Sequence, residues 1–190
     1  MEQIRMLLID SPLLNIPAPE GYAVRPAVRD SVSDAAAWER ACRILNDSIG
    51  TRMEFYKDMI GDPEVGWSNI YFICRKEDGM VCGTATAKIG PESSLHMVGM
   101  DEPFMGLGLS APVCAAAVDR MTREGISRIK LLTDEFRIPA IRTYLKLGFR
   151  PWYFMDDMPG RWRGVFDDMG IPYDRYTAWN EAGTERIPVC

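Results

Sequence analysis

Residues 104–110 read Phe-Met-Gly-Leu-Gly-Leu-Ser, and the fold can be worked out by moving outward from this glycine loop. An apolar segment over 95–100 precedes the loop and is predicted as a strand, and an amphipathic segment over 109–121 follows it and is predicted as a helix. Gly106 and Gly108 lack Cβ atoms, so the backbone can adopt positive φ there and a ligand can approach it closely. Backbone N–H groups gather at such a turn, and the dipole of the following helix favours negative charge. The pattern predicts a place to hold a pyrophosphate group.

Two further segments continue the pattern toward the C-terminus. A short apolar strand is predicted over 129–133, and residues 140–149 then read Ala-Ile-Arg-Thr-Tyr-Leu-Lys-Leu-Gly-Phe. The order strand, glycine loop, helix and strand, closed by A-I-x-x-Y-x-K-x-G-F, resembles the GNAT superfamily of acyl-CoA-dependent N-acetyltransferases. The resemblance is close over 95–152 and looser on both sides. It implies an α/β (α+β) fold with a mixed central β-sheet flanked by helices, acetyl-CoA as co-substrate, and direct attack by an acceptor amine.

The resemblance also assigns residues to the binding of acetyl-CoA. Met105 is the main departure, because the family usually has Arg or Gln there to help hold the pyrophosphate, whereas methionine offers no donor. Three cations are candidates to substitute for it: Lys88, Arg142 and Lys146. Arg137 stands where the family commonly has an asparagine that touches the pantetheine arm, and it either reaches a phosphate or is simply solvated. The predicted co-substrate residues are Val98, Met100, Met105, Gly106, Leu107, Gly108, Leu109, Ser110 and Arg137.

Two residues are predicted to be catalytic. Tyr144 stands where the family often places the tyrosine that protonates the departing thiolate, although packing on a buried helix face is the alternative. His96, the only histidine in the chain, matches a position where arylalkylamine acetyltransferases carry a catalytic base, and its ordinary pKa suits that role. A purely structural histidine is equally compatible with the sequence, and strand alternation predicts that it faces the same way as Val98 and Met100. The competing bases are Glu92, Asp134 and Glu135.

The acceptor side is predicted from the first two helices and the loop after them, which line the acceptor site in the family. Phe55, Tyr56 and Trp67 are the candidate substrate-binding residues, and core packing is the expected role for at least one of them. Trp38 has core spacing and is interpreted as packing. The predicted acceptor is a primary amine of a small molecule. A protein N-terminus or lysine is the first alternative, and a non-catalytic acyl-CoA-binding sensor module is the second.

Bulk properties bound these hypotheses. The 190 residues are expected to form a single domain over 1–190, with an irregular N-terminal arm over 1–20 and an atypical C-terminal extension over 155–190. A net charge of −5 argues against nucleic-acid and anionic-membrane partners. Five cysteines without C-x-x-C spacing indicate a reducing compartment, and no signal peptide or membrane span is seen, so a cytoplasmic location is expected. No metal-ligand cluster is apparent, and the aromatic tail is a candidate homodimer surface.

The remaining elements follow from periodicity and turn residues. A first strand is expected over 21–26, and strands are expected over 69–75 and 80–89 around the turn at 76–79. Apolar residues at positions 35, 38, 42, 45 and 49 predict one long helix, and Thr51 with Glu54 predicts a capping box for the next. In the tail, a strand over 151–154 and a helix over 162–169 are expected. The remainder is interpreted as a strand, a lid or a dimer arm, in place of the closing strand hairpin common in the family.

Overall fold

The computed structural model describes residues 2–44, 47, 50 and 53–189, and these form two compact units. The first unit contains residues 1–11 and 127–190, and the second contains residues 12–126. The predicted Leu45 and Ile49 positions of the long helix, and Thr51 of the capping box, lie outside the described residues. The single-domain expectation stays a prediction.

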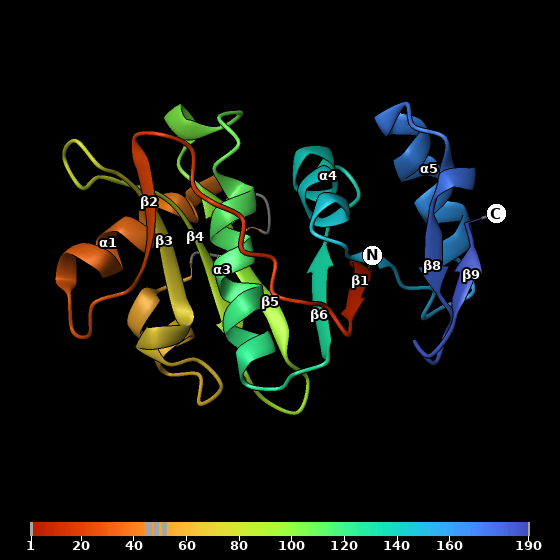
Figure 1. Ribbon diagram of the computed structural model, residues 1–190, viewed down its shortest axis with the longest axis horizontal. Coiled ribbons are helices and arrows are strands. Elements are labelled where there is room, and N and C mark those ends of the chain that lie inside the picture. The colour runs from red at the N-terminus through yellow and green to blue at the C-terminus, as the bar shows by residue number, and fades with distance from the viewer. Residues whose placement is uncertain (1, 45–46, 48–49, 51–52, 190) are drawn as a thin grey trace. The chain divides into compact units, whose positions relative to one another are not determined.

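The unit over 12–126 is built on four antiparallel strands in the order β2-β3-β4-β5 (Figure 1). The strands are β2 (Tyr22–Pro26), β3 (Ile70–Arg75), β4 (Val81–Lys88) and β5 (Ser94–Met100). The turn between β3 and β4 is the predicted one, with Gly79 at φ +72° and Arg75 bonded to Asp78. Local alternation and turn chemistry were sufficient to predict these strands to within about two residues.

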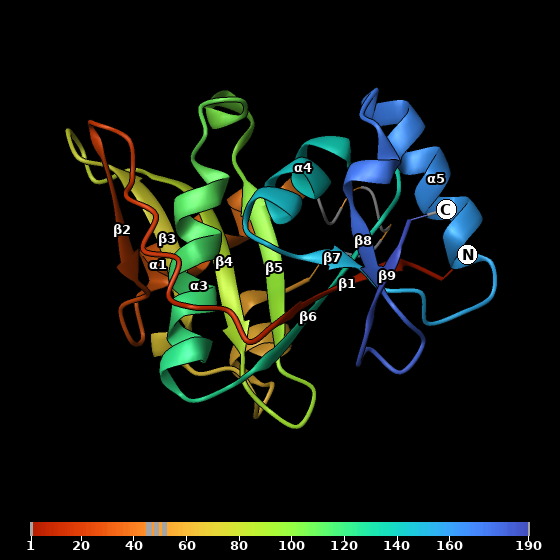
Figure 2. The same ribbon diagram turned by 45° about the vertical axis from the view of Figure 1, so that its right-hand side comes forward.

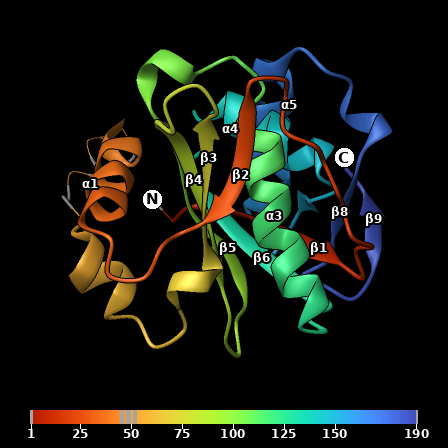
Figure 3. The same cartoon turned by 60° about the vertical axis from the view of Figure 1, so that its left-hand side comes forward.

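Helices lie on both faces of these four strands. Helix α1 (Val32–Ala41) covers one face and helix α3 (Ser110–Arg123) the other, as Figure 3 shows. The described residues of this unit also form three short elements: the π-helix η1 (Phe55–Ile60) and the 3-10 turns η2 (Trp67–Asn69) and η3 (Glu102–Phe104). A hydrophobic cluster fills the α1 side and includes the completely buried Trp38, Phe55 and Phe72. The interpretation of Trp38 as a packing residue is confirmed.

The unit over 1–11 and 127–190 corrects two predictions about the ends of the chain. Residues Ile4–Ile9 form a strand, β1, between β6 (Arg128–Thr133) and β7 (Arg150–Pro151), antiparallel to both. The expected irregular arm over 1–20 is therefore wrong for its first half. Pro12 to Glu20 do form a loop, tied to α3 because the buried Asp119 accepts hydrogen bonds from Leu14 N and Asn15 N at 2.6 and 3.0 Å.

The tail contains the closing hairpin that the sequence was not expected to form. Helix α4 (Ile138–Lys146) precedes β7, and helix α5 (Met158–Met169) follows it and begins four residues earlier than predicted. A 3-10 turn, η4 (Tyr173–Arg175), then leads into the antiparallel pair β8 (Thr177–Trp179) and β9 (Arg186–Pro188), shown beside α5 in Figure 2. Phe166 of α5 packs on Tyr176 with ring centroids 5.0 Å apart, which fixes the base of the hairpin to the helix.

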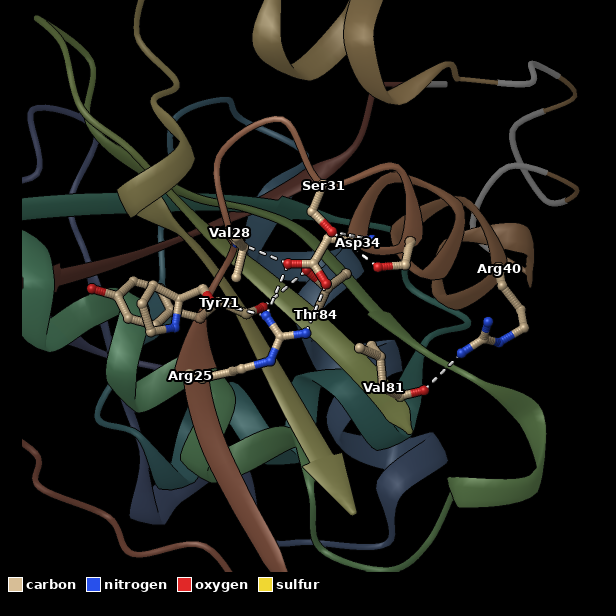
Figure 4. Close-up of polar contacts among 10 residues, drawn as sticks. Arg25, Val28, Ser31, Asp34, Arg40, Tyr71, Val81 and Thr84 are labelled. Atoms are coloured by element: carbon tan, nitrogen blue, oxygen red, sulfur yellow. Dashed lines mark hydrogen bonds and ion pairs between the residues drawn. The ribbon is translucent and has the colours of Figure 1, made fainter. Parts of the chain in front are cut away.

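A partly buried ion pair between Arg25 and the buried Asp34 fixes the start of α1 (Figure 4). Both oxygens of Asp34 accept hydrogen bonds from Arg25, at 2.7 and 2.9 Å, and one also accepts from Val28 N at 2.8 Å. Ser31 Oγ caps the helix by accepting from Asp34 N. Burial raises the pKa of the Asp34 carboxyl, but the hydrogen bonds from Arg25 and Val28 outweigh it, so the pKa lies below its ordinary value. The pair thus ties β2 to the first turn of α1.

Replacing Asp34 by Ala is expected to lower the free energy of unfolding by about 1–3 kcal/mol, because Arg25 and the Val28 amide lose their acceptor. Urea unfolding followed by circular dichroism measures the change. Glu102→Ala is the matched control, since its partner Arg43 is exposed and surface pairs contribute about 0–1 kcal/mol. Equal losses in the two variants would contradict the structural role given to Asp34.

Candidate functional site

The glycine loop is fixed at both ends by buried side chains. Asp101, Phe104 and Leu109 are almost completely buried, whereas Met105 and Leu107 are 47% and 51% exposed. Asp101 Oδ1 accepts from Glu102 N at 3.1 Å, and its Oδ2 accepts from Arg40 Nε at 2.7 Å. The loop therefore presents its middle residues to solvent while its ends stay in place.

Arg40 connects this loop to the rest of its unit. Besides the bond to Asp101, its Nη2 donates to the carbonyl oxygen of Val81 at 2.8 Å, a contact drawn in Figure 4. One guanidinium on α1 thus holds both the first residue of β4 and the start of the glycine loop. Sequence reasoning missed Arg40 and Asp101, because no local pattern links residues 61 positions apart.

The loop backbone has the geometry expected of an anion site. Gly106 and Gly108 have φ angles of +78° and +74°, and no atom lies within 4 Å of where a Cβ would stand on either. No side chain caps the N-terminus of α3. The N–H groups of Leu109, Ser110 and Ala111 have no partner within the helix, and Pro112 has none to offer. The buried Leu109 side chain leaves only its backbone for a ligand.

Strand β5 carries a β-bulge beside the loop. Thr84 of β4 pairs with Gly99 and Thr86 pairs with His96, so two residues of β5, Met97 and Val98, stand opposite one residue of β4. Met97 has φ +44°, which is uncommon for a residue with a side chain. An extra residue of this kind shifts the alternation of the side chains beyond it.

The bulge corrects the predicted orientation of His96. Residues that pair directly across two strands present their side chains on the same face of the sheet. Ile70, which belongs to the hydrophobic cluster on the α1 side, pairs with Thr86, and Thr86 in turn pairs with His96. His96 therefore faces α1. Met100 pairs with Gly83, and Gly83 pairs with Ile73, which points away from α1 because it alternates with Phe72. Met100 therefore lies on the α3 face, where its Sδ is in contact with Gly83. The prediction that His96 and Met100 share a face is wrong.

His96 lies among charged groups on the α1 side. Burial lowers the pKa of its imidazole most strongly, the Lys88 ammonium lowers it further, and the Asp62 carboxylate raises it, so the pKa lies below the ordinary value. Lys88 Nζ is bound by Asp62 Oδ2 at 2.6 Å and Glu64 Oε2 at 3.5 Å. The predicted role of Lys88 as a substitute phosphate cation therefore competes with two carboxylates already in place. The arrangement favours a neutral imidazole.

The aromatic candidates form one cluster around Phe55. Its ring lies 5.6 Å from that of Trp38, 5.5 Å from Tyr56 and 5.2 Å from Trp67. Phe55 is completely buried, so its ring has no surface to offer a ligand, whereas Tyr56 is 49% exposed and Trp67 is partly exposed. Tyr56 and Trp67 meet at 66° with centroids 6.1 Å apart, which leaves an aromatic corner.

In the other unit, the remaining candidates have the following surroundings. Tyr144 is 6% exposed on the buried side of α4 and packs edge-on against Phe149 at 6.2 Å. Arg137 Nε donates to Asp134 Oδ2 at 2.8 Å, and its guanidinium lies over the Phe136 ring.

The acidic alternatives of this unit are also engaged. Asp134 accepts a further bond from Gln3, and Glu135 accepts from Arg161 at 2.7 Å. Arg142 Nη2 donates to the carbonyl oxygen of Met169 at 2.5 Å. The roles predicted for all these site residues stay predictions.

The part of the chain that the structure describes has neither a metal-ligand cluster nor a membrane-spanning helix. No group of three or more His, Cys, Asp and Glu side chains in it is placed to hold a metal ion. Within the same residues, no helix has both the length and the apolar character needed to cross a membrane.

The chain is similar to several known proteins. Mycothiol acetyltransferase from Thermomonospora curvata is 26% identical over 161 residues, covering 77% of this chain and 50% of the relative. The protein of the same name from Kytococcus sedentarius is 26% identical over 146 residues, covering 73% and 49%. The chain therefore spans about half the length of the curated relatives it matches.

Solved structures share the fold. The GCN5-related N-acetyltransferase from Kribbella flavida has a TM-score of 0.56 at 20% identity, over 80% of this chain and 55% of its own. A tandem GNAT protein from the clavulanic acid biosynthesis pathway has a TM-score of 0.54 at 16% identity, over 79% and 50%. The predicted α/β GNAT fold is confirmed. A sequence profile described as "Acetyltransferase (GNAT) family" matches residues 34–149, which is more than half of the chain. The chain belongs to the GNAT family of acetyltransferases.

Proposed function

We propose that this protein transfers the acetyl group of acetyl-CoA to a primary amine of a small molecule. The observation that carries the proposal is the glycine loop, which joins two positive-φ glycines to an uncapped helix N-terminus in a chain of the GNAT family. Such an end attracts phosphate groups through its N–H donors and its dipole.

The residues of the loop fit the pyrophosphate of acetyl-CoA. Gly106 and Gly108 have no neighbour within 4 Å of a would-be Cβ, so a phosphate can approach their backbone. Leu109, Ser110 and Ala111 supply N–H donors, and the Ser110 hydroxyl adds a further one. Met105 adds no polar contact, so the backbone carries most of the binding.

The chemistry requires two proton transfers. The amine nitrogen attacks the thioester carbonyl carbon, the C–S bond breaks, and the amine proton passes to a base while the thiolate receives a proton. His96 is the proposed base, because its surroundings favour the neutral imidazole that can accept a proton. Tyr144 is the proposed acid, from the family resemblance of 140–149.

The acceptor proposal has two supports. The aromatic corner of Tyr56 and Trp67 suits the apolar body or the cationic head of a small amine. The two curated relatives described above are both named mycothiol acetyltransferase, and this supports a small-molecule acceptor over a protein.

The proposal is tested in two stages. Calorimetric titration with acetyl-CoA is expected to give micromolar binding, on the order of −8 kcal/mol. The protein is then incubated with acetyl-CoA and either glucosamine, putrescine, tryptamine or a peptide with a free N-terminus, and the acetylated product is measured by mass spectrometry. Acetylation of the peptide alone would favour a protein acetyltransferase, and tight binding without any product would favour a sensor module. No binding at all would exclude the proposal.

Gly108→Ala is expected to weaken acetyl-CoA binding about tenfold or more, because the new Cβ stands where the phosphates must approach. The strain of a positive φ should also lower stability by about 1–2 kcal/mol. Gly125→Ala is the matched control, since Gly125 has φ +80° and equal room but lies after the C-terminus of α3. Equal affinity losses in both variants would assign the effect to strain and not to the loop.

Met105→Arg is expected to tighten acetyl-CoA binding roughly three- to tenfold, since the exposed position would gain a charge-assisted donor. Met105→Leu keeps the apolar character and should leave the Kd unchanged. The same calorimetric titration gives both values. Unchanged affinity of the arginine variant would mean that the pyrophosphate does not lie beside residue 105.

His96→Gln is expected to lower kcat on a working amine about 10²-fold and to remove the acid limb of the pH profile of kcat/KM. In the wild type this limb should lie below about pH 6.5, the ordinary pKa of histidine, because burial and Lys88 lower the pKa. Tyr144→Phe is expected to lower kcat while leaving the acid limb in place. If neither variant changes kcat, both catalytic assignments are wrong.

A further inference from the structure

A charged cluster lies beside His96 on the α1 side of the sheet. Lys88, the last residue of β4, is bound by Asp62 and Glu64 from the turn that follows η1, with N···O distances of 2.6 and 3.5 Å. The three side chains are only 20–28% exposed. This charged cluster is the set Asp62, Glu64 and Lys88, and its net charge is negative.

The backbone holds the cluster in one position. Glu64 N donates to Asp62 Oδ1 at 2.9 Å, which orders the turn. Ile89 N donates to the Glu64 carbonyl oxygen at 3.0 Å, and the Glu64 side chain lies against Gly90. These contacts fix the turn to the end of β4. The carboxylates of Asp62 and Glu64 are therefore held next to the Lys88 ammonium.

The strand register directs Lys88 toward His96. Thr86 pairs with His96 and Lys88 pairs with Ser94, beyond the bulge and in regular alternation. Lys88 and Thr86 are two residues apart and share a face, so Lys88 is the diagonal neighbour of His96 on that face. Diagonal neighbours are about 7–8 Å apart at the backbone, within reach of a lysine side chain.

The charges on this face act on the imidazole in opposite directions. The Lys88 ammonium disfavours a second positive charge on His96, while the Asp62 carboxylate favours it. Burial, which lowers the pKa of the imidazole most strongly, acts in the same direction as Lys88. Among the described residues, Lys88 from β4 and Asp62 and Glu64 from the turn after η1 are the charged groups of this cluster, and Asp62 is itself bonded to Lys88.

We propose that Lys88 is a positioning residue for His96: Asp62 and Glu64 hold it as the diagonal neighbour of the imidazole, where its ammonium adds to the effect of burial in disfavouring a positive charge on the ring, so that the ring is ready to accept a proton from the acceptor amine. The role of the imidazole as base rests on the proposed function. The effect of Lys88 on the imidazole does not depend on it, and the two parts are tested separately.

The chain has one histidine, so its imidazole can be followed without assignment. Proton–carbon correlation spectra of the ring, recorded across a pH series on the ligand-free protein, give the pKa of His96. In Lys88→Met the pKa of His96 is expected to rise, because the ammonium that lowers it is lost and the Asp62 carboxylate no longer has Lys88 as its ion-pair partner. In Lys88→Arg the pKa should stay near the wild-type value. An unchanged pKa in Lys88→Met overturns the proposal.

Asp62→Asn provides a test of opposite sign, which also covers failure of Lys88→Met to fold. Removing this carboxylate takes away a charge that raises the pKa, so the pKa of His96 is expected to fall. A rise in Asp62→Asn would overturn the electrostatic account.

Lys76→Met is the matched control. Lys76 lies in the turn before β4, and Lys88 is the last residue of that strand. Because β4 is roughly 23 Å long, the two lysines are separated by about this distance. This exceeds the screening length of about 10 Å at ordinary salt, so the variant removes the same charge without acting on His96. A pKa rise equal to that of Lys88→Met would show a non-specific effect of net charge and overturn the proposal.

The kinetic readout links Lys88 to the reaction. On a working amine, the acid limb of kcat/KM is expected to move to higher pH in Lys88→Met and to return in Lys88→Arg. If the pKa measured by spectroscopy rises but the acid limb does not move, His96 is not the base and that part of the proposed function fails. The effect of Lys88 on the pKa of the imidazole would still be established.

Discussion

The extra residue in β5 is the constraint on which the arrangement of the candidate site depends. Two residues, Met97 and Val98, stand opposite one residue of β4, and this shift turns His96 toward α1 while Met100 keeps to the α3 side. Without the bulge, His96 would share a face with Met100 and lie away from the charged cluster. A backbone irregularity of a single residue thus decides which chemical groups meet on each face of the four-stranded sheet.

The two faces consequently have different characters. On the α3 face, Gly83 lies in contact with Met100. The α1 face combines a large aromatic cluster with His96 and the charged cluster at its border. Arg40 belongs to the helix on the α1 face and fixes the start of the glycine loop through Asp101. A displacement of α1 would therefore be transmitted to the start of the glycine loop through the Arg40 guanidinium.

Much of this could be predicted from the sequence, for reasons that particular residues make clear. The hairpin at 76–79 and the positive φ of Gly106 and Gly108 follow from local chemistry and are present. Strand β1 was missed because Met6, Leu7 and Leu8 are all buried, so the segment shows no alternation and lies near prolines. The bulge was missed because Met97 adopts a positive φ without a glycine to mark it. The contacts of Arg40 and Lys88 join residues far apart in sequence, and no local pattern reports them.

The pairing of β1 has a consequence for how the chain folds during synthesis. Ile4–Ile9 leaves the ribosome before its partner strand Arg128–Thr133, which follows only after roughly 120 further residues. At about 5–20 residues per second, this apolar strand waits on the order of 6–24 s without a partner, while residues 12–126 form a contiguous segment that can fold first. Contacts of such high sequence separation slow folding and leave an edge available for aggregation. Residues 4–9 are therefore expected to stay exposed to chaperones and to misfolding for longer than the strands within residues 12–126.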